Sequence, residues 1–420
     1  MMRELTLEHH QHNLKYNLAH EFIWGFGAAF HTVYALVPLF LKELSAPEYI
    51  TVSSVGIFSI MIAFPTLFSA AFGRNIINIK KAVILAHSPI LLVTFMMGFT
   101  FLIYDPALVN NAWKIYLCFF ILYGISIGII VPVWTEFINK STIDSLRGKF
   151  LGLGFAFNSL GGLLGGIALK ILLLSELIFP KNFGIGFFIL FFSLLLGTIL
   201  FFPFKSKRNK INFPKQTFKS FFFKTKDIIK NHKNFQKYIL SRIFYCASLP
   251  GMGLYVICCQ NKIMFDVSEI GTFTIITIIF SAISSYVSGF IGDTYGNKKS
   301  MLLAYFAHLC APLITLFASN ILGVYLVFVA VGIGQGSFMP AAMNLVYDFA
   351  KQRDSKTYMA LIDSLLAPFV LIYLFIIGVL INNKQYNLAL IILIISLLIG
   401  LIVITLFVKD PKSDESYNKD

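Results

Sequence analysis

Charged residues are scarce in this chain of 420 residues. Asp, Glu, Lys and Arg together make up 13% of it, apolar residues make up 57%, and the mean hydropathy is +0.78. A soluble domain carries about 25% charged residues, so this chain has too little polar surface to face water on all sides. Long apolar runs with few charges are typical of membrane spans. The sequence therefore predicts an all-α polytopic membrane protein.

Several chemical signatures are missing as well. The five cysteines all fall in apolar stretches, with neither metal-ligand spacing nor a disulfide framework. There is no Gly-rich phosphate loop, and no paired carboxylates or nucleophile stand in an apolar run. We therefore expect no enzyme activity, no cofactor and no metal site. His9, His10 and His12 offer metal-binding side chains, but a solvated tail explains them more simply.

The formal net charge is +14, and its distribution decides its meaning. Between Lys205 and Arg242 there are twelve Lys or Arg and one acid, Asp227. The other basic clusters occupy alternate loops, and the loops between them carry acids. This alternation follows the positive-inside rule and predicts a multi-pass inner-membrane protein with both termini in the cytoplasm. The basic loops would contact anionic lipids, and no nucleic-acid partner is expected.

Twelve apolar segments have the length that a membrane core of about 30 Å requires. They lie at residues 21–41, 51–73, 82–103, 114–136, 150–172, 183–204, 239–260, 269–291, 300–318, 320–345, 357–381 and 387–408. The first twenty residues are polar and lack the pattern of a cleaved signal peptide, so we expect the first span to be retained.

These segments divide the chain into five parts. We expect an N-terminal tail at 1–20, a six-helix bundle at 21–204, a basic linker at 205–238, a second six-helix bundle at 239–408 and a tail at 409–420. An internal repeat supports the two bundles. The spacing of Asn75, Asn78, Lys80 and Lys81 recurs 218 positions later in Asp293, Gly296, Lys298 and Lys299, and Pro132 recurs in Pro340.

The most specific motif is Gly289-x-x-Gly292-Asp293-x-x-Gly296-x-Lys298-Lys299. Its glycines would let the eighth span approach a neighbouring helix closely. Its aspartate would lie at a helix end, where the N-terminus of another helix or a basic side chain can hold it. An ordinary tight turn with basic residues at the lipid headgroups is the simpler alternative.

This motif resembles the signature loop of the major facilitator superfamily, in its second-half copy. The resemblance extends over the chain through the number of spans, the basic central loop and the repeat. It implies twelve transmembrane helices in two pseudo-symmetric six-helix bundles, with a latch that closes the cytoplasmic side. The first-half copy departs from the pattern, because Asn75 and Asn78 replace the aspartate and the glycine.

The partner of this latch is predicted at the start of the fifth span, in Arg147, Gly148 and Lys149, with Asp293 held there when the cytoplasmic gate is shut. Glu136 and Asp363 lie one or two turns from the cytoplasmic ends of their spans and are further gate candidates. The run Gly161-Gly162-x-x-Gly165-Gly166 resembles an antiporter motif, with glycine in place of proline, although tight packing alone also explains it. The segments around Trp134 and Pro180 are similar to a bacterial subgroup of facilitators whose substrates are mostly unassigned.

Polar side chains within spans are costly and so mark candidate sites. The residues expected to line a substrate cavity are His31, Asn158, Tyr245, Tyr255 and Gln335. His31 is also explained by a packing role, and His308 is expected to be structural.

Together these features favour a monomeric secondary active transporter of a small organic solute that works by alternating access. The coupling ion and the direction of transport stay open, with a proton or another ion and efflux among the candidates. The alternative is a transport-inactive relative that serves as a membrane sensor or assembly partner, which the altered first-half motif favours.

Overall fold

The computed structural model describes residues 5–33, 36–72, 78–103, 111–207, 218–263, 265, 269–351 and 355–411. In these segments the regular elements are helices, and no strand occurs. The altered first-half motif residue Asn75 lies outside the described residues.

The first half of the chain contains seven α-helices. They are α1 (Leu7–Ala28), α2 (Leu36–Glu43), α3 (Glu48–Phe72), α4 (Ile79–Ile103), α5 (Ala112–Ser141), α6 (Arg147–Leu173) and α7 (Lys181–Ile199). A 3-10 turn, η1 (Ala29–His31), ends α1, and another, η3 (Asp144–Leu146), precedes α6.

The second half contains eight α-helices and a final π-helical turn. They are α8 (Phe218–Asn231), α9 (Lys233–Tyr245), α10 (Ser248–Lys262), α11 (Glu269–Tyr295), α12 (Asn297–Phe317), α13 (Ile321–Ala350), α14 (Ser355–Asn382), α15 (Tyr386–Ile402) and η4 (Val403–Phe407).

The helices form two compact units. The first comprises Met1–Ile143 with Phe157–Pro214, and the second comprises Asp144–Ala156 with Lys215–Asp420. The division falls inside α6, whose first turns group with the second unit. The predicted first bundle ran from 21 to 204; the first unit also includes 1–20 and 205–214, and it lacks residues 144–156 of that bundle. The reason is the close packing of the start of α6 on α11, described below.

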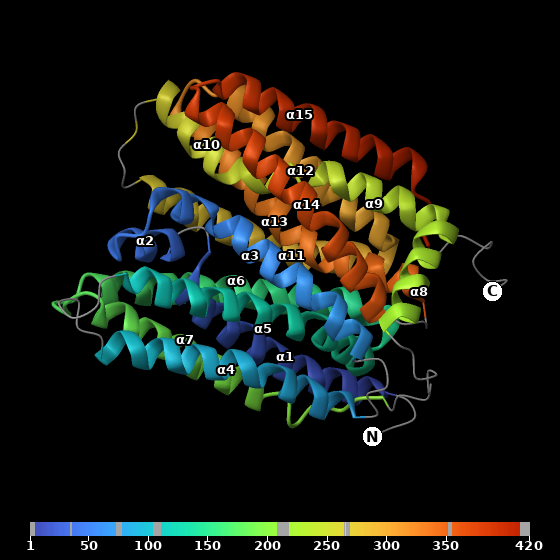
Figure 1. The fold of residues 1–420 in the computed structure, drawn as a ribbon. Helices are drawn as coiled ribbons and strands as arrows, with labels where there is room; N and C mark the ends of the chain where they lie inside the picture. Colours follow the sequence, from blue (N-terminus) through green and yellow to red (C-terminus); the bar gives the residue numbers. More distant parts are fainter. Residues whose placement is uncertain are drawn as a thin grey trace. The chain divides into compact units, whose positions relative to one another are not determined.

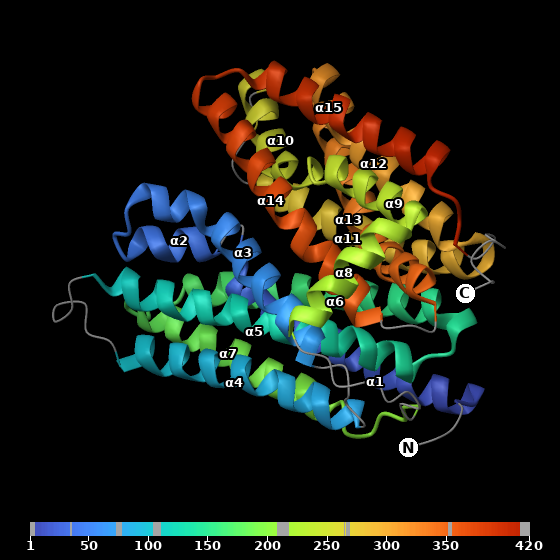
Figure 2. The same cartoon turned by 45° about the vertical axis from the view of Figure 1, so that its right-hand side comes forward.

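In the first unit, α4 packs between α5 and α7, α1 packs on α7, and α3 packs on α5. Figures 1 and 2 show α4, α5 and α7 lying side by side. Large apolar side chains remain on the outside of this unit, such as Leu92 at 61% exposure and Phe192 at 55%. An apolar outer surface suits lipid contact, since hydrocarbon imposes no cost on it.

In the second unit, α13 packs against both α11 and α12, and α15 packs on α12 and α9 (Figure 2). Helices at the predicted repeat positions match in length. α5 and α13 both have 30 residues and contain Pro132 and Pro340, and α6 and α14 have 27 and 28 residues. This agreement supports the duplication that the sequence indicated.

The number of spans is close to the prediction without matching it. Among the described residues ten helices are long and apolar enough to cross a membrane, and a bent pair makes eleven. The predicted second span corresponds to α3, in which the described apolar stretch Gly56–Thr66 is shorter than a span requires. The polytopic all-α prediction is confirmed, whereas twelve spans are not confirmed as a number.

The bent pair is the predicted seventh span. Its two arms, Lys233–Gly251 and Leu254–Lys262, meet at 50°. Pro250 and Gly251 lie at the bend, and both weaken the backbone hydrogen bonding of a continuous helix.

The N-terminal segment differs from the polar tail expected over residues 1–20, because α1 already begins at Leu7. Thr6 and His9 form a capping box that stabilises this helix start. The buried amide of Asn13 donates to the carbonyl oxygens of Ser141 (2.8 Å) and Lys205 (2.7 Å). The Nδ1 of His10 accepts a hydrogen bond from the amide N–H of Ile143, and the Nε2 of His12 lies 3.1 Å from the carbonyl oxygen of Pro203. Polar side chains therefore tie these turns to the unit.

The helix packing of the second unit can be tested at two glycines. A Cβ at Gly336 would overlap the backbone oxygen of Ser281 on α11, whereas a Cβ at Gly378 would meet nothing within 4 Å. We expect Gly336→Ala to destabilise by about 1–3 kcal/mol through overpacking. The control Gly378→Ala should be neutral or stabilise by up to about 1 kcal/mol through helix propensity. Thermal unfolding in detergent measures both, and equal midpoints would contradict the described α11–α13 contact.

Candidate functional site

The carboxylate of Asp293 binds the first turn of α6. Its two oxygens accept hydrogen bonds from the backbone N–H groups of Gly148 (2.7 Å) and Lys149 (2.6 Å). These N–H groups have no acceptor within their own helix, because they belong to its first four residues. The positive end of the helix dipole also favours a carboxylate here. The predicted partners are thus brought together within the second unit, and their gating role stays a prediction.

Glycine is required on both helices for this contact. A Cβ at Gly148 would lie 2.5 Å from the backbone oxygen of Gly289. A Cβ at Gly289 would overlap the backbone oxygen of Gly148, and one at Gly152 would overlap that of Ser285. The small residues that the sequence analysis noted in the fifth and eighth spans therefore let the backbones touch.

Arg147 has two neighbours that the sequence analysis did not name. It forms an ion pair with Asp144 in the turn just before α6, and its guanidinium lies 4.8 Å from the ring centroid of Tyr347. Lys149 is exposed and contributes to the Asp293 contact through its backbone N–H. The backbone N–H groups of the helix N-terminus therefore hold the carboxylate, and the share of Arg147 in this contact stays a prediction.

The rest of the motif builds the turn between α11 and α12. Gly296 has a φ of 99°, a conformation that L side chains rarely adopt, which explains the glycine. A Cβ at Gly292 would overlap the side-chain oxygen of Asn297. Lys298 donates to the carbonyl oxygen of Thr405 (2.9 Å), and Lys299 is exposed.

The two remaining gate candidates have other surroundings. Glu136 is buried in the first unit and lies 3.8 Å from Lys140, one turn later in α5. Asp363 lies in α14 of the second unit, within electrostatic range of Arg242. Each therefore has a local basic neighbour.

His31, the first cavity candidate, lies in an aromatic cluster of the first unit and is only 3% exposed. Its Nε2 lies 3.0 Å from the hydroxyl of Tyr116, and its ring lies 4.4 Å from that of Tyr123. Phe120 and Phe187 complete the cluster. This environment agrees with the packing role that the sequence left open.

Asn158, the second cavity candidate, pairs with a residue that the sequence analysis missed. Its amide donates to the side chain of Glu21 (3.0 Å) and to the backbone oxygen of the same residue (3.2 Å). Glu21 is 5% exposed. Its position at the first residue of a predicted span was the available signal, but it looked like an ordinary end charge.

The three candidates of the second unit have the following surroundings. The hydroxyl of Tyr245 lies 2.6 Å from Nδ1 of His308, and its ring stacks on Phe338. The buried hydroxyl of Tyr255 has no hydrogen-bond partner in the described part of the chain. Gln335 is half-buried on α13, one turn before Phe338.

A second residue was missed in this unit. Arg242, which we had counted with the basic residues of the central loop, lies nine positions into α9 and has a buried Nε. At about 1.5 Å per residue, it lies about 14 Å along the helix from Lys233.

The Glu21–Asn158 pair can be tested by a mutant cycle. Asn158→Leu leaves a buried carboxylate without its donor, and we expect a loss of about 1–3 kcal/mol of stability. Glu21→Leu combined with Asn158→Leu should lose less than the two single changes together, since the cost of the unpaired group disappears. Glu21→Gln, which keeps an acceptor, serves as the control. Strict additivity in thermal unfolding would show that the pair is energetically unimportant.

Comparison with known proteins gives a consistent result. Residues 243–420 match the family model described as "Major Facilitator Superfamily". No curated protein matches the chain in sequence.

Three solved structures illustrate the fold. The transporter FucP, in the outward conformation, has a TM-score of 0.72 at 11% identity, over 93% of this chain and 97% of its own. The proton:xylose symporter XylE has a TM-score of 0.72 at 12% identity, over 96% of each chain. The human organic anion transporter MFSD10 has a TM-score of 0.72 at 12% identity, over 94% of this chain and 99% of its own.

These likenesses at low identity show the fold, and the family model adds a match in sequence over the second half. The chain is thus a multi-pass membrane protein with a transporter fold, and its resemblance to the major facilitator superfamily is confirmed.

Proposed function

We propose that this protein is a secondary active transporter that moves a small organic solute by alternating access. The observation that carries the proposal is the Asp293 carboxylate on the first turn of α6. A transporter needs contacts that hold one state firmly and still break in each cycle. Charge-assisted hydrogen bonds suit this requirement, because each contributes about 1.5–3 kcal/mol net.

Two such bonds give a free energy comparable to what a conformational switch needs. A shift from 1:99 to 99:1 between two states requires about 5.5 kcal/mol. α6 begins among residues of the second unit and continues among residues of the first. We therefore propose that breaking the Asp293 contact frees the start of this helix and opens the cytoplasmic gate.

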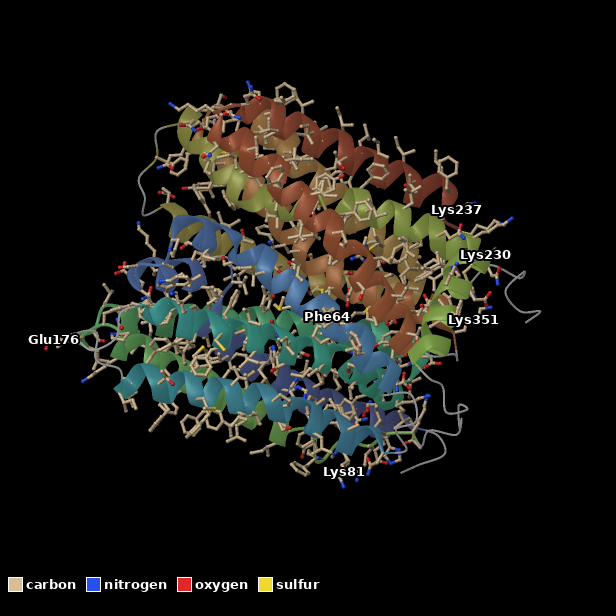
Figure 3. All side chains as sticks on the ribbon, viewed as in Figure 1. Phe64, Lys81, Glu176, Lys230, Lys237 and Lys351 are labelled. Atoms are coloured by element: carbon tan, nitrogen blue, oxygen red, sulfur yellow. The ribbon has the colours of Figure 1, made fainter. Side chains whose placement is uncertain are left out.

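We propose that the protein lies in the inner membrane with both termini in the cytoplasm, as the sequence predicts. In the first unit, Lys81 and Glu176 lie at opposite ends of the bundle (Figure 3). In the second unit, Lys230, Lys237 and Lys351 lie toward one end (Figure 3). The three basic residues at one end of the second unit, and the basic Lys81 at the end opposite the acidic Glu176 in the first, support this orientation through the positive-inside rule.

Anionic lipids are proposed partners of α8. This helix carries exposed Lys226 and Lys230 together with Phe223, which is 58% exposed. A basic helix with an exposed aromatic residue suits the lipid headgroup region.

The substrate cannot be taken from the fold. The titles of the similar structures name xylose for one protein and organic anions for another, so one fold serves different solutes. A secondary transporter also needs a driving gradient, and a proton or another ion is the proposed species. We propose that the protein works as a monomer.

Alternating access can be tested without a substrate, by distances between spin labels. In a chain without its five native cysteines, one label pair would replace Lys81 and Lys230, on the predicted cytoplasmic side. A second pair would replace Glu176 and Lys384, on the opposite side. We expect two populations in each pair, with opposite changes in distance. Asp293→Asn should shift the cytoplasmic pair toward its longer distance, because the helix N-terminus loses its carboxylate.

Asp227→Asn is the matched control, since it removes an exposed carboxylate from α8. It should leave both distributions unchanged. If Asp293→Asn behaved like this control, the latch would be excluded. A single population in every variant would favour the transport-inactive sensor over the transporter.

A further inference from the structure

The guanidinium of Arg242 is a cation without a carboxylate partner in the described part of the second unit. Its Nη1 donates a hydrogen bond to the hydroxyl of Tyr238 (3.1 Å). Its Nε is buried and has no hydrogen-bond partner among the described residues. Among the described residues, no carboxylate oxygen lies within 4.0 Å of the guanidinium nitrogens.

Two aromatic rings partly stabilise this charge. The centroid of Phe338 lies 4.6 Å from the guanidinium carbon, and that of Tyr238 lies 5.8 Å from it. A cation over a ring gains about 0.5–2 kcal/mol. An unpaired cation within a span is far more costly than that, and is a site by default.

Asp363 on α14 is an acidic residue that lies within electrostatic range of Arg242. Its carboxylate forms no recorded hydrogen bond or ion pair with the described residues. It lies eight positions after Ser355, about 12 Å along α14 from the helix start. Arg242 lies at a similar distance from the start of α9. The pair is therefore close enough to interact and too far apart to satisfy the donors of the arginine.

We infer that Arg242 binds the anionic group of the transported solute, and that this solute is an organic carboxylate. A guanidinium presents parallel N–H donors that match the two oxygens of a carboxylate. Arg242 is only half-buried, so part of the group remains accessible. The half-buried ring of Phe338 contacts the guanidinium of Arg242 and stacks on Tyr245 at 4.9 Å, and its remaining exposed edge offers an apolar surface to the organic part.

The inference rests on the proposed transport function but has a separate test. The full-length protein in detergent is titrated with benzoate, lactate and succinate, each beside its neutral amide. Thermal unfolding and equilibrium binding are measured. We expect at least one carboxylate to bind and stabilise the protein while its amide does not.

Three variants then test the arginine. Arg242→Gln should weaken carboxylate binding about 10- to 100-fold, and Arg242→Lys should weaken it less, since it keeps the charge without the fork. Asp363→Asn should tighten binding, because it removes a competing negative charge. Lys237→Gln, which removes an exposed cation from the same helix, should bind like the parent.

Two results would overturn the inference. One is a panel in which no carboxylate binds better than its amide. The other is a carboxylate that binds Arg242→Gln as tightly as the parent, or Arg242→Lys if the glutamine variant fails to fold. If the spin labels still show two populations of distances in that case, the proposal of alternating access is retained and the proposal of an anionic substrate is rejected. Carboxylate binding without exchange would instead leave the site in place and remove the transport proposal.

Discussion

The apolar interior of a membrane offers no water to polar groups, so each polar group of the spans must find a partner within the protein. Much of this structure follows from that constraint. Asp293 is held by two backbone N–H groups at a helix start, and Glu21 by the amide of Asn158. Asn13 joins the end of α5 to the chain that leaves α7. Against this background Arg242 is an exception, because the described residues around it leave a charge and a donor unsatisfied.

The residues that the sequence predicted well act through local spacing. The Gly289–Lys299 motif forms a turn whose glycines each lie close to a backbone or side-chain atom. Eleven consecutive residues are therefore enough to predict the turn. Its link to α6 was also predictable, since it depends on a helix N-terminus and small residues. Within the same site, the ion pair of Arg147 with Asp144 was not predicted, although the two residues lie only three positions apart.

The residues that the sequence missed depend on partners far along the chain. Glu21 is separated from Asn158 by 137 positions, and Asn13 from Lys205 by 192. Hydropathy treats such residues as the polar ends of spans, so a helix that begins at Leu7 was taken for a tail. Arg242 shows the same limit. It follows a dense basic run, and the rings of Tyr238 and Phe338 around its half-buried side chain distinguish it from a loop charge.

The bend in the seventh span has a mechanical consequence. A helix transmits displacement along its axis while its hydrogen bonds are continuous, and the two arms here meet at 50° near Pro250. Arg242 lies on the first arm, which contacts α12 through Tyr305 and His308, and α14 and α15 as well. A displacement of the guanidinium would therefore be carried to these helices, and the bend would weaken its transmission to the second arm. The joint would let a small local movement at one end of the span proceed without repacking the other.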